Sequence, residues 1–382
     1  MNRGPVPGMS RVCYDIMALS MAPGIGPVAI SRILEELKDP GEIFSLGDAR
    51  MRYVLGPRSA AEPDDIRKAR ENTVFLKELD RMEGSGIKAL CVKDAGYPGP
   101  LSNIYDAPPV LYYKGEILEA DDNSVAIVGS RNCTIYGMQM AEKLARGLSE
   151  AGITVISGMA KGIDTAAHMG ALRAGGRTIA VMGTGFGSLY PSGSEAVVDK
   201  ISAMGAVVTE YVSDAPVRRG NFPRRNRMIS GMAKGVVVVE AAARSGALIT
   251  ASLALEEGRE VFAVPGRADS PCSVGTNSLI RNGAKLVSDV GDVIEEIWPG
   301  LPSGKCFRPV PVDRAVGPCV SSACGGSIMK ALSGKGSVHV DDIAAGSGVR
   351  VQDLSETLLR MEMEGLVEQL PGRFFRVCTG TL

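Results

Sequence analysis

The chain has 382 residues, of which 45% are hydrophobic and 22% charged, a composition typical of two or three folded domains rather than of a disordered chain. Its 42 lysines and arginines nearly balance 43 aspartates and glutamates, so the formal net charge is −1. Bulk electrostatics therefore do not attract nucleic acid, and any anion must be bound by a local cluster of charge.

Cysteine and histidine, the residue types that hold most structural zinc ions, are scattered. The eight cysteines form no C-x-x-C pair, and the chain contains two histidines. This distribution predicts reduced thiols, no metal site and no cofactor. No apolar run approaches the roughly 18 residues that span a bilayer, and no signal-peptide pattern is present. We therefore expect a cytoplasmic protein without a membrane partner.

Residues 1–80 are predicted to form a small helical domain. Apolar residues recur at helical spacing around residues 15–19 and 29–34, on either side of a Pro-Gly-Ile-Gly-Pro turn at 23–27. This pattern resembles a helix-hairpin-helix or SAM-like domain, in which glycines let backbone N–H groups approach a phosphate. A plain tight turn between packed helices is the alternative, because no lysine or arginine follows the turn until Arg32.

Residues 81–298 are predicted to form an extended Rossmann domain with a lead-in strand at 87–92. Short β-branched runs alternate with amphipathic stretches, which indicates a doubly wound parallel α/β sheet covered by helices on both faces. The expected strands lie at 125–128, 154–156, 178–182, 206–209, 236–239, 261–264 and 285–287. The expected helices include 137–150, 164–174, 192–203 and 247–257.

The end of the chain is predicted to hold a linker and a winged helix. Residues 299–326 are rich in Pro, Gly and Ser and include the close pair Cys319 and Cys324. Within 327–382, expected helices at 328–332, 340–345 and 351–364 precede a hairpin at 366–369 and 374–377. The third helix carries four carboxylates against Arg360, whereas a DNA-reading helix presents positive charge. This favours a structural or protein-docking winged helix over a DNA reader.

Five arginines crowd residues 217–227, a segment that lies between two strand-like runs and has Phe222 at its centre. Guanidinium groups bind phosphates in a bidentate manner, and an exposed aromatic ring can stack on a base. The cluster therefore favours a site for a nucleic-acid backbone or a nucleotide phosphate. The alternative is a solvated face, or ion pairs with acidic loops.

The turn after the first parallel strand, Gly129-Ser130-Arg131, lies where open α/β sheets bind ligands. The glycine permits close backbone approach, the serine offers a hydroxyl and the arginine a guanidinium. We expect Arg131 to bind an anion; the alternative is a pair with a carboxylate of a neighbouring loop.

A second turn runs from Ser157 and Gly158 through Lys161 and Gly162 into the next helix. Helix N-terminal N–H groups together with a lysine make an anion site. His168, further along that helix, is expected to be structural rather than a catalytic base. The loop at Arg244 to Gly246, with the later Gly-Thr-Asn turn, completes the expected rim.

These turns together resemble the DNA-processing protein A family (DprA, also called Smf). The resemblance rests on the ordered motifs GSR, SGMAKGIDTAAH, FPRRNRMISG, VEAAARSGALITA, PGR and GTN over residues 124–297. It implies a helical N-terminal domain, an extended Rossmann domain and a terminal winged helix. It also implies a single-stranded DNA-binding protein, not an enzyme, that protects incoming DNA, dimerises through the Rossmann domain and loads RecA recombinase during natural transformation.

The resemblance also implies a set of DNA-binding residues on five separate segments. These are Gly129, Ser130, Arg131, Ser157, Gly158, Lys161, Gly162, Phe222, Arg224, Asn226, Arg227, Arg244, Ser245 and Asn277. The chain departs from the family pattern at Ser194, where the family commonly has Asn.

Two other functional readings compete with this one. A phosphoribohydrolase of the lysine-decarboxylase-like group would share the topology and could use Glu240 and Arg227, although the P-G-G-x-G-T stretch of that group is missing. A scaffold whose Rossmann dimer only docks partners would bind no oligonucleotide, and its clustered arginines would then lack a purpose.

Overall fold

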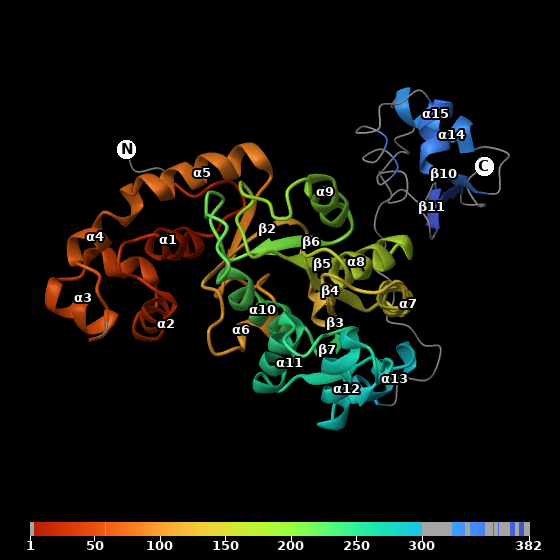
Figure 1. The fold of residues 1–382 in the computed structure, drawn as a ribbon. Helices are drawn as coiled ribbons and strands as arrows, with labels where there is room; N and C mark the ends of the chain where they lie inside the picture. The colour runs from red at the N-terminus through yellow and green to blue at the C-terminus, as the bar shows by residue number, and fades with distance from the viewer. Residues whose placement is uncertain are drawn as a thin grey trace. The chain divides into compact units, whose positions relative to one another are not determined.

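The computed structural model describes residues 4–57, 59–299, 323–332, 337–347, 354, 358, 367–370 and 374–377. It divides into two compact units, Met1–Pro311 and Val312–Leu382, and each is described by itself. The first unit joins a helical region to a large mixed sheet (Figure 1).

A nine-stranded sheet organises the first unit, in the order β1-β2-β6-β5-β4-β3-β7-β8-β9. Strands from β6 to β9 in this order are parallel, and β1 and β2 extend the sheet by antiparallel pairing. The strands are β1 (Lys88–Cys91), β2 (Val110–Gly115), β3 (Ser124–Val128), β4 (Thr154–Gly158), β5 (Thr178–Val181), β6 (Ala206–Thr209), β7 (Gly235–Val238), β8 (Glu260–Ala263) and β9 (Lys285–Leu286). The predicted doubly wound α/β fold is confirmed.

Helices cover both faces of this sheet, because successive residues of a strand point to opposite faces. In β3, Val125 and Ile127 pack in one apolar layer, and Ala126 and Val128 in the other. The first layer includes α7 (Ile135–Glu150), α8 (Ile163–Arg173) and α13 (Val290–Ile297). The second includes α6 (Gly99–Ser102), α10 (Asn221–Met232), α11 (Gly246–Glu256) and α12 (Val274–Arg281), while α9 (Glu195–Met204) packs on β5 and β6.

The helical region packs directly on the antiparallel edge of the sheet. Its helices are α1 (Arg11–Ser20), α2 (Pro27–Glu36), α3 (Asp48–Leu55), α4 (Pro63–Arg67) and α5 (Thr73–Ser85). One apolar core combines buried residues of these helices with Cys91 of β1 and with Val110 and Tyr112 of β2. A boundary at residue 80 therefore divides the sequence pattern but not the hydrophobic core.

The turn between α1 and α2 is built for packing. Gly24 has a φ of +75°, and a Cβ there would lie 2.6 Å from the backbone of both Ala60 and Ala61. The Arg32 guanidinium donates to the carbonyl oxygens of Tyr53 and Val54. These contacts support a tight turn between packed helices, the second of the two interpretations of this segment.

The second unit has its own small core and sheet. Its described elements are α14 (Ala323–Leu332), β10 (Val338–His339), α15 (Val340–Ser347), β11 (Val367–Leu370) and β12 (Phe374–Val377). The strands pair in the order β10-β12-β11, so the expected hairpin is joined by a strand that the sequence pattern did not predict. Ile328, Ile343 and Phe375 are buried together. Of the expected acidic helix at 351–364 the structure describes Leu354 and Leu358, both buried; its charged residues, like most of the expected linker, fall outside the described residues.

Among the helices that the structure describes, none combines the length and apolar character that a bilayer crossing requires.

The topology creates one switch point. From β3 the chain proceeds through β4, β5 and β6 on one side, and then returns to place β7 on the other side of β3. Loops that leave the carboxyl ends of β3 and β7 therefore diverge and open a crevice between them, the usual ligand position in an open α/β sheet.

Candidate functional site

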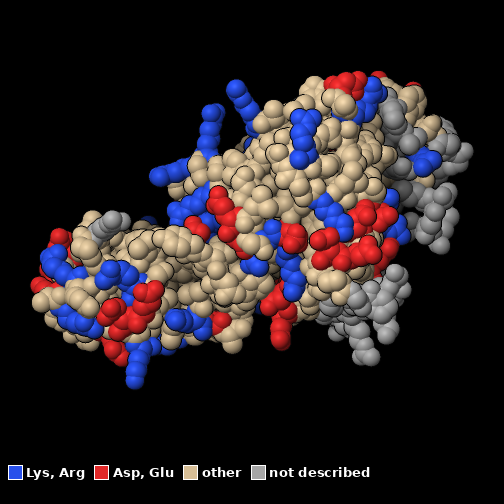
Figure 2. All heavy atoms as spheres, turned by 90° about the horizontal axis from the view of Figure 1, so that it is seen from below, with Lys and Arg blue, Asp and Glu red and all other residues tan. Residues whose placement is uncertain are grey.

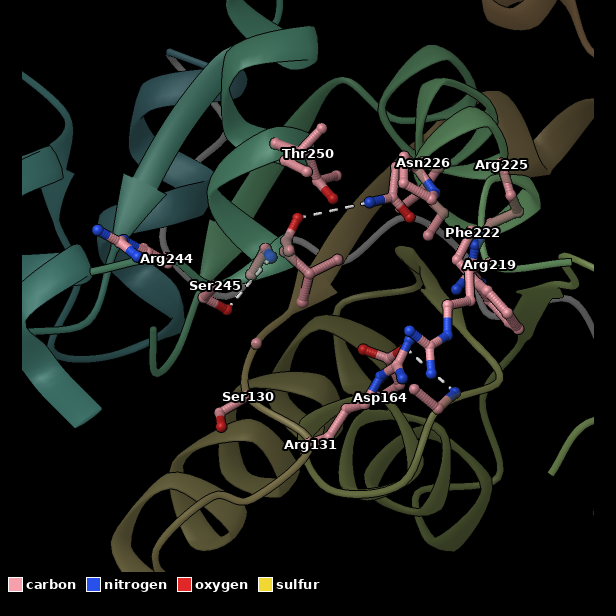
Figure 3. A pocket seen from close by; sticks show the side chains of 18 of the residues that line it. Ser130, Arg131, Asp164, Arg219, Phe222, Arg225, Asn226, Arg244, Ser245 and Thr250 are labelled. Carbon is pink, nitrogen blue, oxygen red and sulfur yellow. Dashed lines mark hydrogen bonds between the residues drawn. The ribbon is translucent and has the colours of Figure 1, made fainter. Parts of the chain in front are cut away.

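A cavity of about 890 Å³ occupies this crevice. It is bounded by the loop after β3, the loop between β4 and α8, the segment before α10, one face of α10 and the start of α11 (Figure 3). The polar and aromatic side chains that line it are Ser130, Arg131, Asp164, Tyr190, Arg219, Phe222, Arg225, Asn226, Arg244, Ser245 and Thr250.

The lining is strongly positive although the chain is not. Four arginines face one aspartate, a formal local charge of +3 against −1 for the whole chain. On the face drawn in Figure 2, acidic and basic side chains are both present, which fits the near-neutral charge of the whole chain. Such a focused patch attracts anions even when net charge does not.

The single carboxylate lies beneath the cavity beside Arg225. Burial raises the pKa of Asp164, and the nearby Arg225 guanidinium opposes that rise. Burial likewise lowers the pKa of Arg225, opposed by Asp164, and an arginine remains protonated near neutral pH. Arg131 adds a further like charge close to Arg225. An arriving anion would relieve this repulsion between guanidinium groups.

Helical periodicity divides the arginine cluster between two faces of α10. The helix begins at Asn221, so Phe222, Arg225 and Asn226 share the face that lines the cavity. Arg224 and Arg227, three residues apart, lie together on another face. Their Nη2 atoms are 3.4 Å and 2.6 Å from Oε2 of Glu210. The phase of one helix thus decides which of its side chains border the cavity.

Arg227 does not lie where the sequence analysis expected it, in a phosphate-binding wall of the site. It is 4% exposed, does not line the cavity, and pairs with both Glu210 and Asp106, whose Oδ2 is 2.9 Å from its Nε. A buried carboxylate needs such a partner, because an unpaired charge in the interior is costly. Its ion pairs and its place outside the cavity lining count against the predicted role of Arg227 in the phosphate-binding wall. Arg224 is half exposed but also lies outside the cavity lining.

Phe222 lies among cationic and aromatic neighbours. The guanidinium carbon of Arg131 is 5.4 Å from the centre of its ring, and the Tyr190 ring centre is also 5.4 Å away. Cation–π attraction of this kind orients an arginine beside an aromatic face. The predicted combination of Arg131 with Phe222 is brought together, and Tyr190 joins it.

Three predicted glycines allow the backbone loops to pack closely. A Cβ on Gly129 would meet the side chain of Ile163, and one on Gly158 would collide with Arg225 and Asp164. Gly162 has a φ of +85°, and a Cβ there would lie 2.5 Å from the carbonyl oxygen of Ser130. Their role is therefore to set the loops in place; of the three, only Gly129 lines the cavity.

Some predicted residues are occupied elsewhere. Ser157 is fully buried and donates its hydroxyl to the Ile127 carbonyl oxygen at 2.6 Å. Asn277 exchanges two hydrogen bonds with the backbone of Gly266. Lys161 is exposed beside the cavity but is not part of its lining. The side chains of Ser157 and Asn277 thus bond within the fold and lie outside the cavity lining, where the sequence analysis expected a rim.

The start of α11 forms the opposite rim. Ser245 caps the helix by accepting the N–H of Ala247 at 3.3 Å, and Asn226 donates to the Gly246 carbonyl oxygen at 3.5 Å. Arg244 is exposed at the cavity edge, and its side chain extends away from Arg131 in Figure 3.

Two candidate catalytic groups from the sequence, His168 and Glu240, form hydrogen bonds within the fold. The ring nitrogens of buried His168 contact Oγ1 of Thr178 at 2.7 Å and the carbonyl oxygen of Gly158 at 2.9 Å. Burial lowers the pKa of His168 to about 4. Glu240 accepts both the N–H and the hydroxyl of Thr134 at the start of α7. The structural role expected for His168 is confirmed.

Cys13, Cys91 and Asp94 form the metal-like grouping found among the described residues. The hydrogen bond with Cys91 and burial raise the pKa of Cys13 well above its usual range, so its thiol is protonated. Asp94 accepts the N–H of Cys91 and the hydroxyl of Ser10. These bonds account for the grouping without a metal.

Arg219, Arg225 and Tyr190 line the cavity but were not selected from the sequence. Both arginines belong to the cluster at 217–227, and a helix beginning at Asn221 would have placed Arg225 on the face of Phe222. No local pattern marks Tyr190, which reaches the cavity from the loop after β5.

Fold and site together define a doubly wound α/β protein with an arginine-lined cavity at the switch point of its sheet. The family model for DNA recombination-mediator protein A matches residues 88–298, and the DprA winged helix domain matches residues 314–373. The chain belongs to this family, as the sequence motifs predicted, and the terminal winged helix is confirmed.

Relatives cover most of the chain. "DNA processing protein DprA" of Streptococcus pneumoniae is 43% identical over 290 residues, covering 74% of this chain and 97% of that protein. "Protein Smf" of Synechocystis is 32% identical and covers 93% of this chain and 96% of its own length.

Two solved structures are also similar. The X-ray structure of the S. pneumoniae protein has a TM-score of 0.65 and 38% identity, covering 75% of this chain and 99% of that chain. A Helicobacter pylori DNA processing protein A, whose structure is described for its single-stranded DNA binding mode, has a TM-score of 0.50 and 29% identity. It covers 55% of this chain and 95% of that chain.

Proposed function

We propose that this chain binds single-stranded DNA, with little regard to sequence, in the cavity at the switch point. The observation that carries the proposal is the convergence of the guanidinium groups of Arg131 and Arg219 with the Phe222 ring, above the buried Arg225. Guanidinium groups neutralise backbone phosphates, which carry no sequence information. The single-stranded DNA binding attributed to the H. pylori relative supports the same ligand.

A single strand suits this cavity better than a duplex. Phe222 and Tyr190 offer aromatic rings within the lining. Bases of a single strand can leave their stack and lie on such rings, at a gain of about 1–3 kcal/mol per base. A duplex keeps its bases stacked and paired, and would contact the rings only after local opening. The rings therefore add selectivity that the arginines alone lack.

Fluorescence anisotropy with labelled oligo-dT and a duplex of equal length tests this proposal. We expect tighter binding to the single strand and weaker binding as salt rises. Two neutralised phosphates would give a slope of about −1.4 in log K against log salt, at about −0.7 per phosphate. Equal binding of both ligands, or a flat salt dependence, would refute the assignment.

The family resemblance supports the finer proposal that the chain shields incoming single strands, acts as a homodimer through its Rossmann domain and loads RecA without catalysis of its own. On single strands already coated by another single-stranded DNA-binding protein, the ATPase activity of RecA should start sooner when this chain is added. An unchanged lag, with oligo-dT binding intact, would contradict the loading step alone. Release of free base from nucleoside monophosphates would instead support the phosphoribohydrolase alternative.

A further inference from the structure

We propose that Glu78 of α5 is a positioning residue for the cavity, acting through the segment that carries Arg219. The inference rests on the proposed DNA-binding function and adds to it a role for the helical region. Glu78 does not touch the cavity. It binds Ser213, just before the arginine-bearing segment 216–220, and so limits how that segment can move.

The Glu78 carboxylate is buried against the far part of the chain. It is 3% exposed, and both of its oxygens lie 3.1 Å from the backbone nitrogen of Ser213. Oε1 also accepts the Ser213 hydroxyl at 2.7 Å. Hydrogen bonds to an ionised acceptor are about twice as strong as neutral ones. The backbone N–H and the hydroxyl of Ser213 are thus both bound by the carboxylate of Glu78, 135 residues earlier in the chain.

Neighbouring contacts strengthen the same attachment. Arg81, almost one turn further along α5, pairs with Asp214 at 2.5 Å. Val212 packs against the core of the helical region. The attached segment, 212–214, is therefore bound to α5 by an apolar contact, an ion pair and a buried carboxylate.

The same segment also supports the loop that leads to Tyr190. Gly187 donates its N–H to the Ser213 carbonyl oxygen at 3.0 Å. A Cβ on Gly185 would collide with the Val212 carbonyl oxygen, so the two backbones are in direct contact. Fixing residues 212–214 consequently constrains two walls of the cavity, one with Arg219 and one with Tyr190.

Beyond this attachment the arginine-bearing segment is largely solvated. Residues 216–220 are exposed, and the chain regains regular structure at Asn221, where α10 begins. Val217 and Arg219 reach the cavity from this short span. Anchoring both of its ends reduces the conformational entropy that is lost when the arginine binds a phosphate. Substitution of Glu78 removes the buried carboxylate that holds one end of this segment.

The test uses the full chain in three variants. Glu78→Ala removes both acceptors, Glu78→Gln keeps one acceptor and can donate to the Ser213 hydroxyl, and Glu83→Gln changes an exposed carboxylate on the same helix. For each variant, oligo-dT affinity, thermal unfolding and the rate of tryptic cleavage after Arg218 and Arg219 are measured. Cleavage at these two sites reports the mobility of the segment directly.

We expect Glu78→Ala to weaken oligo-dT binding about tenfold, which corresponds to ~1.4 kcal/mol, and to accelerate cleavage after Arg218 and Arg219. Glu78→Gln should recover most of both properties, and Glu83→Gln should match the unaltered chain. A folded Glu78→Ala variant with unchanged affinity and unchanged cleavage would overturn the proposal. So would faster cleavage at every site in proportion to lower thermal stability, since that indicates a general structural role.

If Glu78→Ala does not fold, Ser213→Ala removes the hydroxyl contact alone and should still raise cleavage at the two arginines. Unchanged cleavage in that variant would count against the proposal. If the unaltered chain binds no oligo-dT, the proposed function fails, whereas the cleavage measurement still decides whether Glu78 holds the segment.

Discussion

Two faces of helix α10 carry the same residue type in different settings. On one face, Arg225 lies beside the cavity with Phe222 and Asn226, where a single aspartate leaves an excess of positive charge. On the other, Arg224 and Arg227 meet Glu210. The comparison teaches that a dense arginine motif is not one binding surface. Arg224 and Arg227 anchor the helix, Arg225 lies buried beside Asp164 beneath the cavity, and Arg219, just before the helix, is exposed to meet an anion.

The largest effect, on stability, is expected on the face of α10 whose arginines pair with Glu210. Arg227→Ala should lower the free energy of unfolding by about 3–5 kcal/mol, because Glu210 would keep a buried charge without its main partner. Urea unfolding followed by circular dichroism measures the loss. Arg227→Met combined with Glu210→Leu should recover most of it, since a buried pair replaced by apolar groups is often tolerated. A stable Arg227→Ala variant that fails to bind DNA would contradict this prediction, because it would show that Arg227 serves the binding site rather than the fold.

A pH-dependent loss of stability is expected beneath the cavity face. The pKa of His168 is about 4 when folded, below its ordinary 6.5, so the unfolded chain binds more protons between these values. Stability contributed by neutral His168 is therefore complete above pH 6.5 and falls as pH drops towards 4, by about 3 kcal/mol. Urea midpoints at several pH values measure this loss. His168→Gln should flatten the profile in that window, and an equally steep profile in the variant would contradict the assignment.

On the cavity face, Arg131→Ala should affect binding rather than stability. Loss of one charge-assisted phosphate contact is expected to cost about 1.5–3 kcal/mol of binding free energy for every oligonucleotide sequence alike. Anisotropy titrations with several oligonucleotides measure the change. Arg146→Ala on α7 removes an exposed arginine that pairs with Glu150, and it should leave affinity nearly unaltered. Selective loss for one sequence would argue against phosphate binding by Arg131.

The smallest effect, on single-strand affinity, is expected for Phe222, whose variants distinguish base stacking on the ring from simple apolar contact. Phe222→Ala should weaken single-strand binding by about 1–2 kcal/mol, within the range for stacked bases. Phe222→Leu keeps an apolar side chain without the ring, so it should lose nearly as much. If the leucine variant binds like the unaltered chain, the ring contributes volume rather than a stacking platform.

Much of the fold could be predicted because the relevant signals are local. Short β-branched strands and amphipathic helices recur in order from residue 124 to 297, and their sequence positions match the observed β3 to α13 closely. The turn at Gly129 to Arg131 follows from the same order, because parallel strands end at one edge of the sheet. Strand β10 was missed because it is only two residues long and gains its identity from pairing with β12.

The sequence by itself determined the order of elements, the family motifs and the gathering of arginine-bearing loops at one edge of the sheet. Only the tertiary structure decided which arginines face the cavity. Glu210 and Asp106 lie far from Arg227 in sequence, and they become its partners through the packing of β6 and the loop before β2 against α10. A guanidinium beside a buried carboxylate stabilises the fold, whereas one at a solvated crevice can bind a phosphate, and local sequence does not encode that difference in neighbours.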